Sequence, residues 1–283
     1  MQIARTVAEY RALRAASLAA RPGLVGVVPT MGYLHEGHQS LMRRARAECG
    51  TVVTTIFVNP TQFGPNEDFS RYPRDEARDL AICEAEGVDI VFAPSVEEMY
   101  PGGAETTVSV GSLSRILEGA ARPGHFDGVA TVVTKLFAIA QADRGYFGQK
   151  DAQQLMVLRR LAEDLRFPIE VVGCPIIREA DGLALSSRNV YLSPEERTQA
   201  LSLSRGLRGA EALWAEGVRD ADALRHRVRH EIEAEPLANI DYVSLADQRT
   251  LEELAGPVTA PALLSLAVRF GATRLIDNIL IAP

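Results

Sequence analysis

The chain has 283 residues, of which 47% are hydrophobic, enough for one large or two moderate domains. Its net charge of −7 argues against a nucleic-acid-binding protein, whose contact surface is usually basic. No stretch approaches the ~20 apolar residues of a membrane span, and the three cysteines are widely spaced. We therefore expect a cytoplasmic protein with no membrane partner and no disulfide framework.

Strand and helix patterns alternate over the first 176 residues. An amphipathic helix pattern covers residues 1–16 and lacks the apolar core of a signal peptide. Strand patterns follow at 24–28, 51–58, 88–93, 144–148 and 169–173, and helix patterns lie at 38–48, 73–86, 128–141 and 151–165. Such alternation predicts βαβ units. We expect an α/β domain over residues 1–176, a Rossmann-like parallel sheet with helices on both faces.

The pattern changes at about residue 176, and residues 177–283 are predicted to form a smaller α+β domain. Residues 176–189 are expected to be a connecting loop, with a turn signal at Asp181-Gly182. Ser193 followed by Pro194 is typical of a helix start. Helix patterns cover 194–216 and 220–235, and strand patterns cover 240–246, 262–269 and 275–281.

The most informative motif is PTMGYLHEGH, residues 29–38, between the first apolar strand pattern and the next helix. A glycine-containing turn from strand to helix is where open α/β folds bind phosphate. His35 and His38 are expected to share one face of the first helical turn, where imidazoles can contact phosphate oxygens and titrate near neutral pH. A surface histidine pair is the simpler alternative, and the spacing does not fit a zinc site.

Two further turns follow predicted strands, at residues 59–74 and 147–151. Because parallel strands end at one edge of a sheet, we expect these turns to converge with the histidine turn. Only two of the 30 basic residues are lysines, Lys135 and Lys150. Lys150, in the second of these turns, is a candidate for binding phosphate through its compact ammonium. Lys135 lies in an apolar helix pattern, where we expect a snorkelling side chain.

Two other polar motifs leave alternatives open. Ser186, Ser187 and Arg188 form a hydroxyl-rich basic turn that can wrap a phosphate, although an ordinary polar loop explains it as well. RPGHFDGV, residues 122–129, has glycines on both sides of His125. It suits either a mobile flap over a pocket or a surface turn, and it leaves the role of His125 open.

Five motifs in fixed order resemble the pattern of the pantothenate synthetases, or pantoate–β-alanine ligases. They are PTMGYLHEGH, FVNPTQFGPNEDFSRYPR, EGAARPGHFDGV, YFGQKDAQQL and READGLALSSRNVYL, and RLIDNI at 274–279 also fits. The resemblance implies ATP-dependent condensation of pantoate with β-alanine through a pantoyl-adenylate. It also implies Mg²⁺ accompanying ATP, a homodimer, and a second domain that closes over the ATP site. More widely, the HxGH turn is similar to that of nucleotidyltransferases and class I aminoacyl-tRNA synthetases.

The same resemblance implies residue roles. His38 is the expected proton donor, Lys150 neutralises charge at the phosphates, and Gln62 and Gln154 hold pantoate. His35, Ser186, Ser187 and Arg188 are expected to assist catalysis at the phosphates. The implied ATP contacts are Met31, Gly32, Tyr33, Leu34, His35, Glu36, Gly37, His38, Gly148, Gln149, Lys150, Asp151, Ile177, Leu185, Ser186, Ser187 and Arg188.

Two residues depart from the family pattern, and two rival functions remain. Tyr33 replaces a smaller residue and is expected to face outward, and Gln149 replaces an acidic residue without expected loss of activity.

The first rival is an adenylyl-transferring ligase with another acceptor. The second is an inactive nucleotide-binding protein, which is disfavoured because His35, His38, Lys150 and the Ser186–Arg188 turn are all present.

Overall fold

The computed structural model describes residues 1–65, 67, 69–102 and 104–282. They form two compact units, Met1–Gln149 with Gln153–Pro175 and Lys150–Ala152 with Ile176–Pro283. The main boundary lies one residue before the expected one. Lys150–Ala152 groups with the second unit, although it follows a strand of the first. Among the described residues, no helix is both long and apolar enough to cross a membrane.

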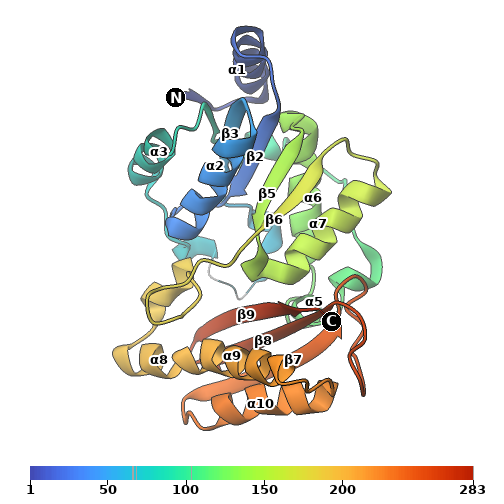
Figure 1. Ribbon diagram of the computed structural model, residues 1–283. Coiled ribbons are helices and arrows are strands. Elements are labelled where there is room, and N and C mark those ends of the chain that lie inside the picture. The colour runs from blue at the N-terminus through green and yellow to red at the C-terminus, as the bar shows by residue number, and fades with distance from the viewer. Residues whose placement is uncertain (66, 68, 103, 283) are drawn as a thin grey trace. The chain divides into compact units, whose positions relative to one another are not determined.

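The first unit is built on a six-stranded sheet in which every pairing is parallel. The order is β1-β4-β3-β2-β5-β6 (Figure 1). Its strands are β1 (Gln2–Ala4), β2 (Val25–Thr30), β3 (Thr51–Ile56), β4 (Ile90–Phe92), β5 (Arg144–Gly148) and β6 (Glu170–Cys174). The predicted parallel sheet is confirmed, and five of its strands were expected from the sequence.

The prediction for the first six residues was wrong. Residues 2–4 pair with β4 as strand β1, and helix α1 (Val7–Ala20) begins only after them. The reason is a capping box: the Thr6 side chain accepts from the Glu9 amide, and the Glu9 side chain accepts from the Thr6 amide. That pair of hydrogen bonds fixes the start of the helix after Thr6. Residues 2–4 therefore lie outside the helix and pair with β4 at the edge of the sheet.

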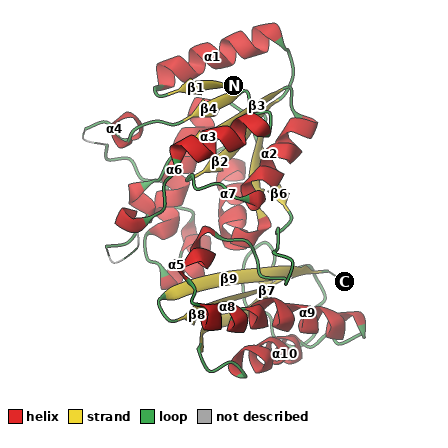
Figure 2. Cartoon of the chain, turned by 90° about the vertical axis from the view of Figure 1, so that its left-hand side faces the viewer, coloured by secondary structure: helices red, strands yellow, loops and turns green. Residues whose placement is uncertain are grey.

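Helices cover both faces of this sheet (Figures 1 and 2). Successive residues of a strand point to opposite faces. Tyr146 of β5 lies in the apolar cluster with α2 (Glu36–Glu48), while the next residue, Phe147, packs against Phe137 of α6 (His125–Ala140) at a ring-centroid distance of 6.2 Å. The remaining helices of this half of the chain are α3 (Glu76–Ala85), α4 (Val96–Met99), α5 (Glu118–Ala121) and α7 (Ala152–Asp164).

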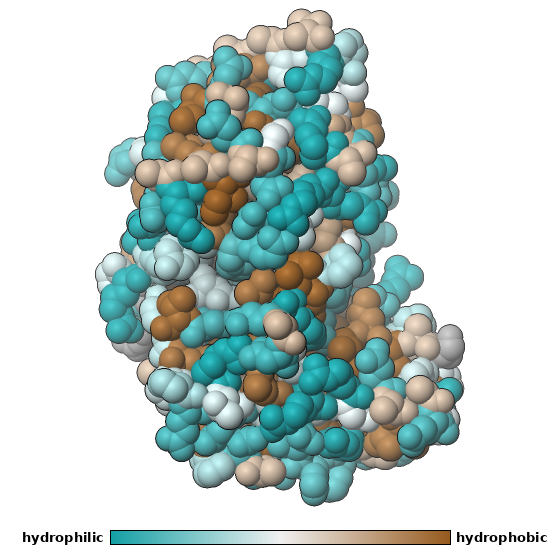
Figure 3. All heavy atoms as spheres, turned by 60° about the vertical axis from the view of Figure 1, so that its left-hand side comes forward, coloured by the Kyte–Doolittle hydropathy of each residue, from teal (hydrophilic) through white to brown (hydrophobic). Residues whose placement is uncertain are grey.

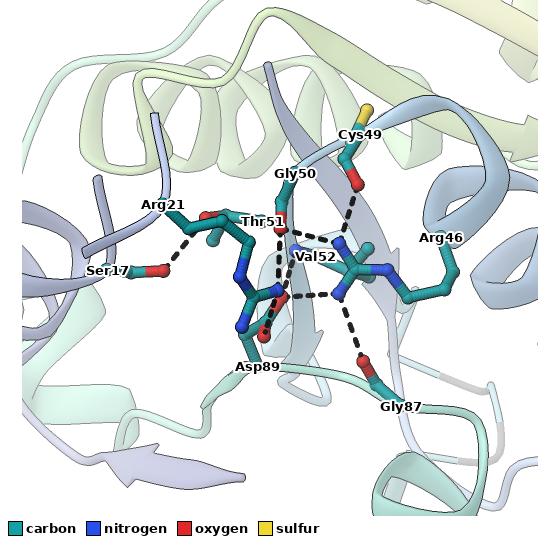
Figure 4. A network of polar contacts seen from close by, with 9 residues as sticks. All are labelled: Ser17, Arg21, Arg46, Cys49, Gly50, Thr51, Val52, Gly87 and Asp89. Atoms are coloured by element: carbon teal, nitrogen blue, oxygen red, sulfur yellow. Dashed lines mark hydrogen bonds and ion pairs between the residues drawn. The ribbon is translucent and has the colours of Figure 1, made fainter. Parts of the chain in front are cut away.

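Polar contacts fasten the amino-terminal edge of the sheet (Figure 4). Asp89, just before β4, accepts from the Val52 amide at 2.8 Å and from Arg46 at 2.6 Å. Arg46 also donates to the carbonyls of Cys49 and Gly50, at 2.6 and 2.5 Å. The end of α2 and the starts of β3 and β4 are thereby joined at the edge opposite the strand ends that lead into the informative turns.

The second unit packs helices against a three-stranded antiparallel sheet in the order β7-β8-β9. Its elements are β7 (Ala238–Asp247), β8 (Ala262–Phe270), β9 (Thr273–Ile281), α8 (Pro194–Gln199), α9 (Leu201–Ala215) and α10 (Ala221–Glu233). The helix expected over 194–216 is divided at Ala200. The Thr198 hydroxyl donates to the Pro194 carbonyl at 2.9 Å, a bond to residue i−4 that bends helices.

Apolar side chains on the molecular surface are distributed among several elements. The face in Figure 3 is mostly hydrophilic and is interrupted by separate apolar patches. The large apolar side chains that are exposed come from both units: Met1, Ile3, Leu24, Val96, Leu165, Val190, Tyr191, Leu237 and Leu280.

Candidate active site

The sheet order brings the informative turns to neighbouring strand ends. β2 lies between β3 and β5, and from β2 the chain adds β3 and β4 on one side, then β5 and β6 on the other. An open parallel sheet has its crevice at this change of direction, outside the carboxyl ends of the strands. The histidine turn, residues 57–62 and Gly148–Gln149 leave β2, β3 and β5 at that edge, so the predicted convergence is confirmed for the start of each turn. Residues 66 and 68 of the predicted 59–74 turn lie outside the described residues.

Asp79 of α3 holds the histidine turn in shape. Its two carboxylate oxygens accept from the amides of Tyr33 and Leu34, each at 2.7 Å. The turn needs this support because Tyr33 has a φ of +50°, a left-handed conformation that strains a residue with a Cβ. Burial raises the pKa of Asp79 above its ordinary value, against the effect of the two amides. Because the amides of Tyr33 and Leu34 donate to Asp79, they are already hydrogen-bonded within the chain.

Tyr33 lies against α3. The Arg78 guanidinium is 5.4 Å from the centroid of its ring, and the side chain is half-buried. Gly32 precedes it with a φ of +79°, and a Cβ there would lie 2.9 Å from a carboxylate oxygen of Asp79. The turn therefore combines a glycine that the buried carboxylate requires with an aromatic ring packed on the neighbouring helix.

His35 and His38 share the first turn of α2, as predicted, with ring centroids 4.2 Å apart. His35 is the N-cap, and its Nδ1 accepts from the Gly37 amide at 3.1 Å. His38 Nδ1 accepts from the His35 amide at 3.3 Å. An accepting nitrogen carries no hydrogen, so each neutral ring has its hydrogen on Nε2. The amides of Gly37 and His35 are therefore used within the chain.

Gln62 belongs to a short 3₁₀ turn, Pro60–Gln62, that follows β3. Its side-chain oxygen accepts from Asn59 at 3.1 Å, and its nitrogen points to the Met31 sulfur at 3.1 Å. Asn59 is itself oriented by the Tyr100 hydroxyl, which donates to it at 2.8 Å. The expected pantoate residue and the expected ATP turn are thus in contact. Asn59 and Tyr100 were missed from the sequence.

The expectations for residues 122–129 hold only in part: residues 122–124 form a surface turn, as one alternative predicted, and the residues after them are helical. His125 is the first residue of α6, and Phe126, Gly128 and Val129 are buried. A Cβ on Gly128 would overlap the Thr61 carbonyl, so this helix end packs directly on Pro60–Gln62. Gly128 therefore allows close packing, whereas Gly124 lies in the exposed turn with a φ of +83°. From His125 on, the segment is a packed helix end and not a flap.

Lys135 also differs from its expectation. Its ammonium lies 4.3 Å from the centroid of the Tyr100 ring and donates to the Met99 carbonyl. This is a cation–π contact, and the lysine does not reach toward solvent. Lys135 contacts Tyr100, Tyr100 donates to Asn59, and Asn59 donates to Gln62. Lys135 therefore stabilises the Gln62 turn indirectly.

The two adjacent glutamines at the start of α7 divide their roles. Gln153 is buried, accepts from the Glu118 amide at 3.0 Å and donates to the carbonyls of Leu113 and Ile116, each at 2.8 Å. Gln154 is half-buried. In the described part of the chain no hydrogen bond involves the Gln154 carboxamide. Gln153 is therefore structural, whereas the Gln154 carboxamide has no such role within the described part of the chain.

Lys150 and the serine turn come together in the second unit. Lys150, Ser186, Asn189 and Asp277 line one small cavity. The Lys150 carbonyl accepts from Asn278 at 2.9 Å, and its ammonium is 3.9 Å from an Asp151 oxygen. This places the ammonium beyond a normal hydrogen bond to that carboxylate.

Residues 176–189 are more ordered than the expected connecting loop. Arg178 and Ala184 form an isolated bridge, and Arg178 binds the buried carboxylate of Asp277 through two nitrogens, at 2.6 and 2.9 Å. The Leu185 amide donates to the Ile177 carbonyl at 2.9 Å, which brings these two expected ATP contacts together.

A short 3₁₀ segment, Ser187–Tyr191, contains the remaining residues of the serine turn. Ser186 is its N-cap and accepts from the Arg188 amide at 3.2 Å. The Asn189 side chain donates to Glu179 and to the Ala184 carbonyl, at 3.0 and 3.1 Å. The predicted basic hydroxyl turn is therefore fixed by its own unit.

Comparisons with known proteins cover the whole chain. The family model for pantoate-beta-alanine ligase matches residues 2–280. The pantothenate synthetase of Roseiflexus sp. (strain RS-1) is 63% identical over 278 residues, covering 98% of each chain. That of Chloroflexus aggregans is 57% identical over 278 residues, covering 98% of this chain and 99% of the relative.

Solved structures agree in fold. A crystal structure of pantothenate synthetase from Thermus thermophilus has a TM-score of 0.93 at 50% identity and full coverage of both chains. A pantoate-beta-alanine ligase from Francisella tularensis, solved with beta-gamma ATP and beta-alanine, has a TM-score of 0.79 at 33% identity, with 99% and 97% coverage. The motifs, the fold and these matches agree, and the chain belongs to the pantoate–β-alanine ligase family.

Proposed function

We propose that this chain condenses pantoate with β-alanine, using ATP, to form pantothenate, AMP and pyrophosphate through a pantoyl-adenylate. The observation that carries the proposal is the contact between the Gln62 carboxamide and Met31 of the histidine turn. A carboxylate held by Gln62 would stand beside a phosphate held by His35 and His38. Membership of the family over residues 2–280 supports the same reaction.

Activation of the carboxylate explains why ATP is needed. A carboxylate oxygen is a poor leaving group, so an amine cannot displace it directly. In the proposed first step this oxygen attacks the α-phosphate, the bond to the bridging oxygen breaks, and pyrophosphate leaves. In the second step the β-alanine amine attacks the carbonyl carbon of the mixed anhydride. AMP then leaves with the electron pair of the carbon–oxygen bond, and the amine loses a proton.

The first step brings two anions together and depends on fixed donors and in-line positioning. In their neutral form the imidazoles of His35 and His38 carry a donor at Nε2, because each Nδ1 accepts a backbone amide. We assign His38 as the donor to the departing pyrophosphate, by a hydrogen bond from Nε2 of the neutral ring and by proton transfer once the ring is an imidazolium. We assign His35 as a phosphate ligand. Lys150 neutralises the charge that develops on the phosphates.

The second unit completes the site in this proposal. Ser186, Ser187 and Arg188 donate to the triphosphate when residues 177–283 close over ATP, and Gln154 joins Gln62 at pantoate. Further ATP contacts come from Met31–His38, Gly148–Asp151, Ile177 and Leu185. The internal order of the serine turn supports this role, because a fixed turn loses less entropy on binding than a mobile one.

Magnesium enters this scheme with the nucleotide. Among the described residues, no group of three or more histidine, cysteine or carboxylate side chains is arranged to hold a metal ion. The triphosphate offers the oxygen ligands that Mg²⁺ prefers. The ion would lower the charge of the phosphates, while the protein supplies the donors at His35, His38 and Lys150.

By analogy with the family, we also propose that the enzyme works in the cytoplasm as a homodimer. Light scattering at assay concentrations measures the mass directly. A monomeric mass for the active enzyme would contradict the dimer.

The test of function is pyrophosphate release from ATP and Mg²⁺ with pantoate and β-alanine omitted in turn. We expect release to require pantoate, and sustained turnover with pantothenate formation to require β-alanine as well. Release with another carboxylic acid in place of pantoate would identify a different acceptor. ATP binding without any release would support the inactive nucleotide-binding alternative.

A further inference from the structure

His125 contacts the backbone of Gln62, although its motif has no part in the proposed reaction. Its Nδ1 lies 2.8 Å from the Gln62 carbonyl oxygen, and its Nε2 lies 2.9 Å from a nitrogen of Arg122. A guanidinium only donates hydrogen bonds, so Nε2 accepts. Nδ1 therefore carries the ring hydrogen and donates it to Gln62. The structure thus fixes which tautomer of His125 is present.

Burial and the charge of Arg122 hold the ring neutral against two nearby carboxylates. Arg122 makes two hydrogen bonds to the Glu67 carboxylate, each at 2.6 Å, and turns its remaining nitrogen toward His125. Burial and the charge of Arg122 lower the pKa of His125 to about 4, while the Gln62 carbonyl, Glu67 and Glu118 act in the opposite direction. Protonation would place an N–H of the ring against an N–H of Arg122.

The first turn of α6 meets the Gln62 turn at a second point. Gly128 is three residues after His125, on the same helix face, and its bare Cα lies against Thr61 and Gln62. The Gly128 carbonyl accepts from the Asn59 side chain at 3.2 Å. Asn59 in turn donates to the Gln62 side chain. The motif therefore fastens both the backbone and the carboxamide of Gln62.

We propose that His125 is a positioning residue for the pantoate site, acting through its Nδ1–H on the Gln62 backbone. Arg122, held by Glu67, keeps His125 in the tautomer that can donate. The inference rests on the proposed function, since it assumes that Gln62 binds pantoate. Loss of this hydrogen bond would displace Gln62 while leaving the histidine turn intact. The consequence is a defect in pantoate use with little change in ATP use.

A pair of substitutions isolates the two ring nitrogens. His125→Asn places an amide N–H near the position of Nδ1, whereas His125→Gln places its amide near the position of Nε2. We expect His125→Gln and His125→Ala to raise the KM for pantoate roughly 3- to 10-fold, the scale of one buried hydrogen bond. His125→Asn should recover most of that loss, and the KM for ATP should change less than 2-fold, roughly the error of such a comparison.

Three comparisons complete the experiment. His226→Ala, a histidine of the second unit, is the control and should match the wild type. Nitrogen NMR of the wild type should show hydrogen on His125 Nδ1. Hydrogen on Nε2, an unchanged pantoate KM in all three His125 variants, or equal losses for ATP and pantoate would overturn the proposal. Failure of the wild type to use pantoate would instead overturn the proposed function.

Discussion

His35 and His38 use different nitrogens for structure and for chemistry. Each Nδ1 accepts an amide at the start of α2, a capping contact worth about 0.5–2 kcal/mol in helix stability. Each Nε2 carries the hydrogen that can be donated to a ligand. Replacing either histidine with alanine therefore removes two functions at once. Asparagine separates them, because its carboxamide oxygen accepts near the position of Nδ1 and nothing replaces Nε2.

His38→Asn should therefore lose activity and keep stability. We expect adenylate formation to fall by ~10²–10³, the scale of one preorganised donor, while the free energy of unfolding changes by less than ~1 kcal/mol. Single-turnover pyrophosphate release and urea unfolding measure the two quantities. His38→Ala should lose both. A wild-type rate in His38→Asn would remove His38 from the proton-donor role.

Lys150 tests whether a compact ammonium is required. Its side chain is 21% exposed, with the ammonium 3.9 Å from Asp151, so it is accessible and weakly paired. Lys150→Ala should slow adenylate formation by ~10²–10³, and Lys150→Arg should also be impaired, because a planar fork does not replace a point charge. Lys135→Arg is the matched control and should stay active, since arginine keeps a cation over Tyr100. Full activity in Lys150→Arg would contradict the argument from lysine scarcity.

His125 makes stability depend on pH. Its pKa is about 4 in the folded chain against an ordinary value of 6.5, so between these values the unfolded chain binds more protons. Stability is then complete above pH 6.5 and is lost as pH falls toward 4. The loss should be roughly 1–3 kcal/mol, at about 1.4 kcal/mol per pKa unit. Urea unfolding of the wild type and of His125→Asn at pH 7 and pH 4.5 measures the part of this loss that comes from His125. Equal losses in both proteins would contradict this origin.

At the scale of elements, local signals were sufficient for strands and turns. The apolar run before residue 29, the glycine in the turn and the helical spacing after residue 38 are all within one segment, and the structure confirms β2, the turn and α2. The contacts that hold the turn are distant in sequence. Asp79 reaches across 46 and 45 residues to Tyr33 and Leu34, and His125 reaches across 63 residues to Gln62.

Such partners leave few marks in a sequence. Asp79 and Cys83 are the buried residues of α3, four positions apart. A carboxylate on the buried face of a helix pattern was the available signal, since buried charges need partners. For His125 the sequence signal was misleading, because glycines on both sides of a residue are typical of mobile segments. Only the close approach of Gly128 to Thr61 shows that this glycine serves packing, whereas Gly124 serves the turn through its positive φ.

Two glycine-to-alanine substitutions should have opposite effects. At Gly148 a Cβ would meet no heavy atom of the described residues within 4 Å, so Gly148→Ala should keep or slightly raise thermal stability. It should raise the KM for ATP, because the open space is where we place the nucleotide. At Gly128 the Cβ would overlap the Thr61 carbonyl, so Gly128→Ala should destabilise the fold by several kcal/mol, as overpacking does.

Thermal unfolding and ATP kinetics of both variants are the measurements. An unchanged KM for ATP in Gly148→Ala would remove the turn after β5 from the nucleotide site. A stable Gly128→Ala variant with normal pantoate use would show that α6 can move away from the Gln62 turn without consequence.

At the scale of the whole chain, sequence reasoning succeeded where each unit follows a common plan. Alternating patterns predicted the parallel sheet, and the later change of pattern predicted the smaller α+β unit. The grouping of Lys150–Ala152 with residues 176–283 was not predictable. It depends on contacts such as that between Asn278 and the Lys150 carbonyl, 128 residues apart.

In the first unit, stabilising contacts lie at the amino-terminal edge of the sheet, and the proposed substrate-binding residues lie at its carboxyl-terminal edge. A six-residue strand such as β3 spans about 20 Å at ~3.3 Å per residue. The Arg46 and Asp89 contacts lie at the amino-terminal edge (Figure 4), and the histidine turn and Gln62 follow the carboxyl-terminal edge. Changes at the first edge should therefore lower stability without reaching the substrates.

Arg46→Ala tests this separation. The substitution leaves Asp89 with the Val52 amide and the exposed Arg21 as partners and removes donors from the carbonyls of Cys49 and Gly50. We expect a loss of roughly 1–3 kcal/mol in unfolding free energy, the range for hydrogen bonds to charged groups. The KM values for ATP and pantoate should stay at wild-type levels. Arg5→Ala is the matched control, since Arg5 and Glu76 form an exposed pair, worth at most about 1 kcal/mol. Urea unfolding and steady-state kinetics of both variants decide the matter: a raised KM in Arg46→Ala would mean that the two edges are coupled through the strands.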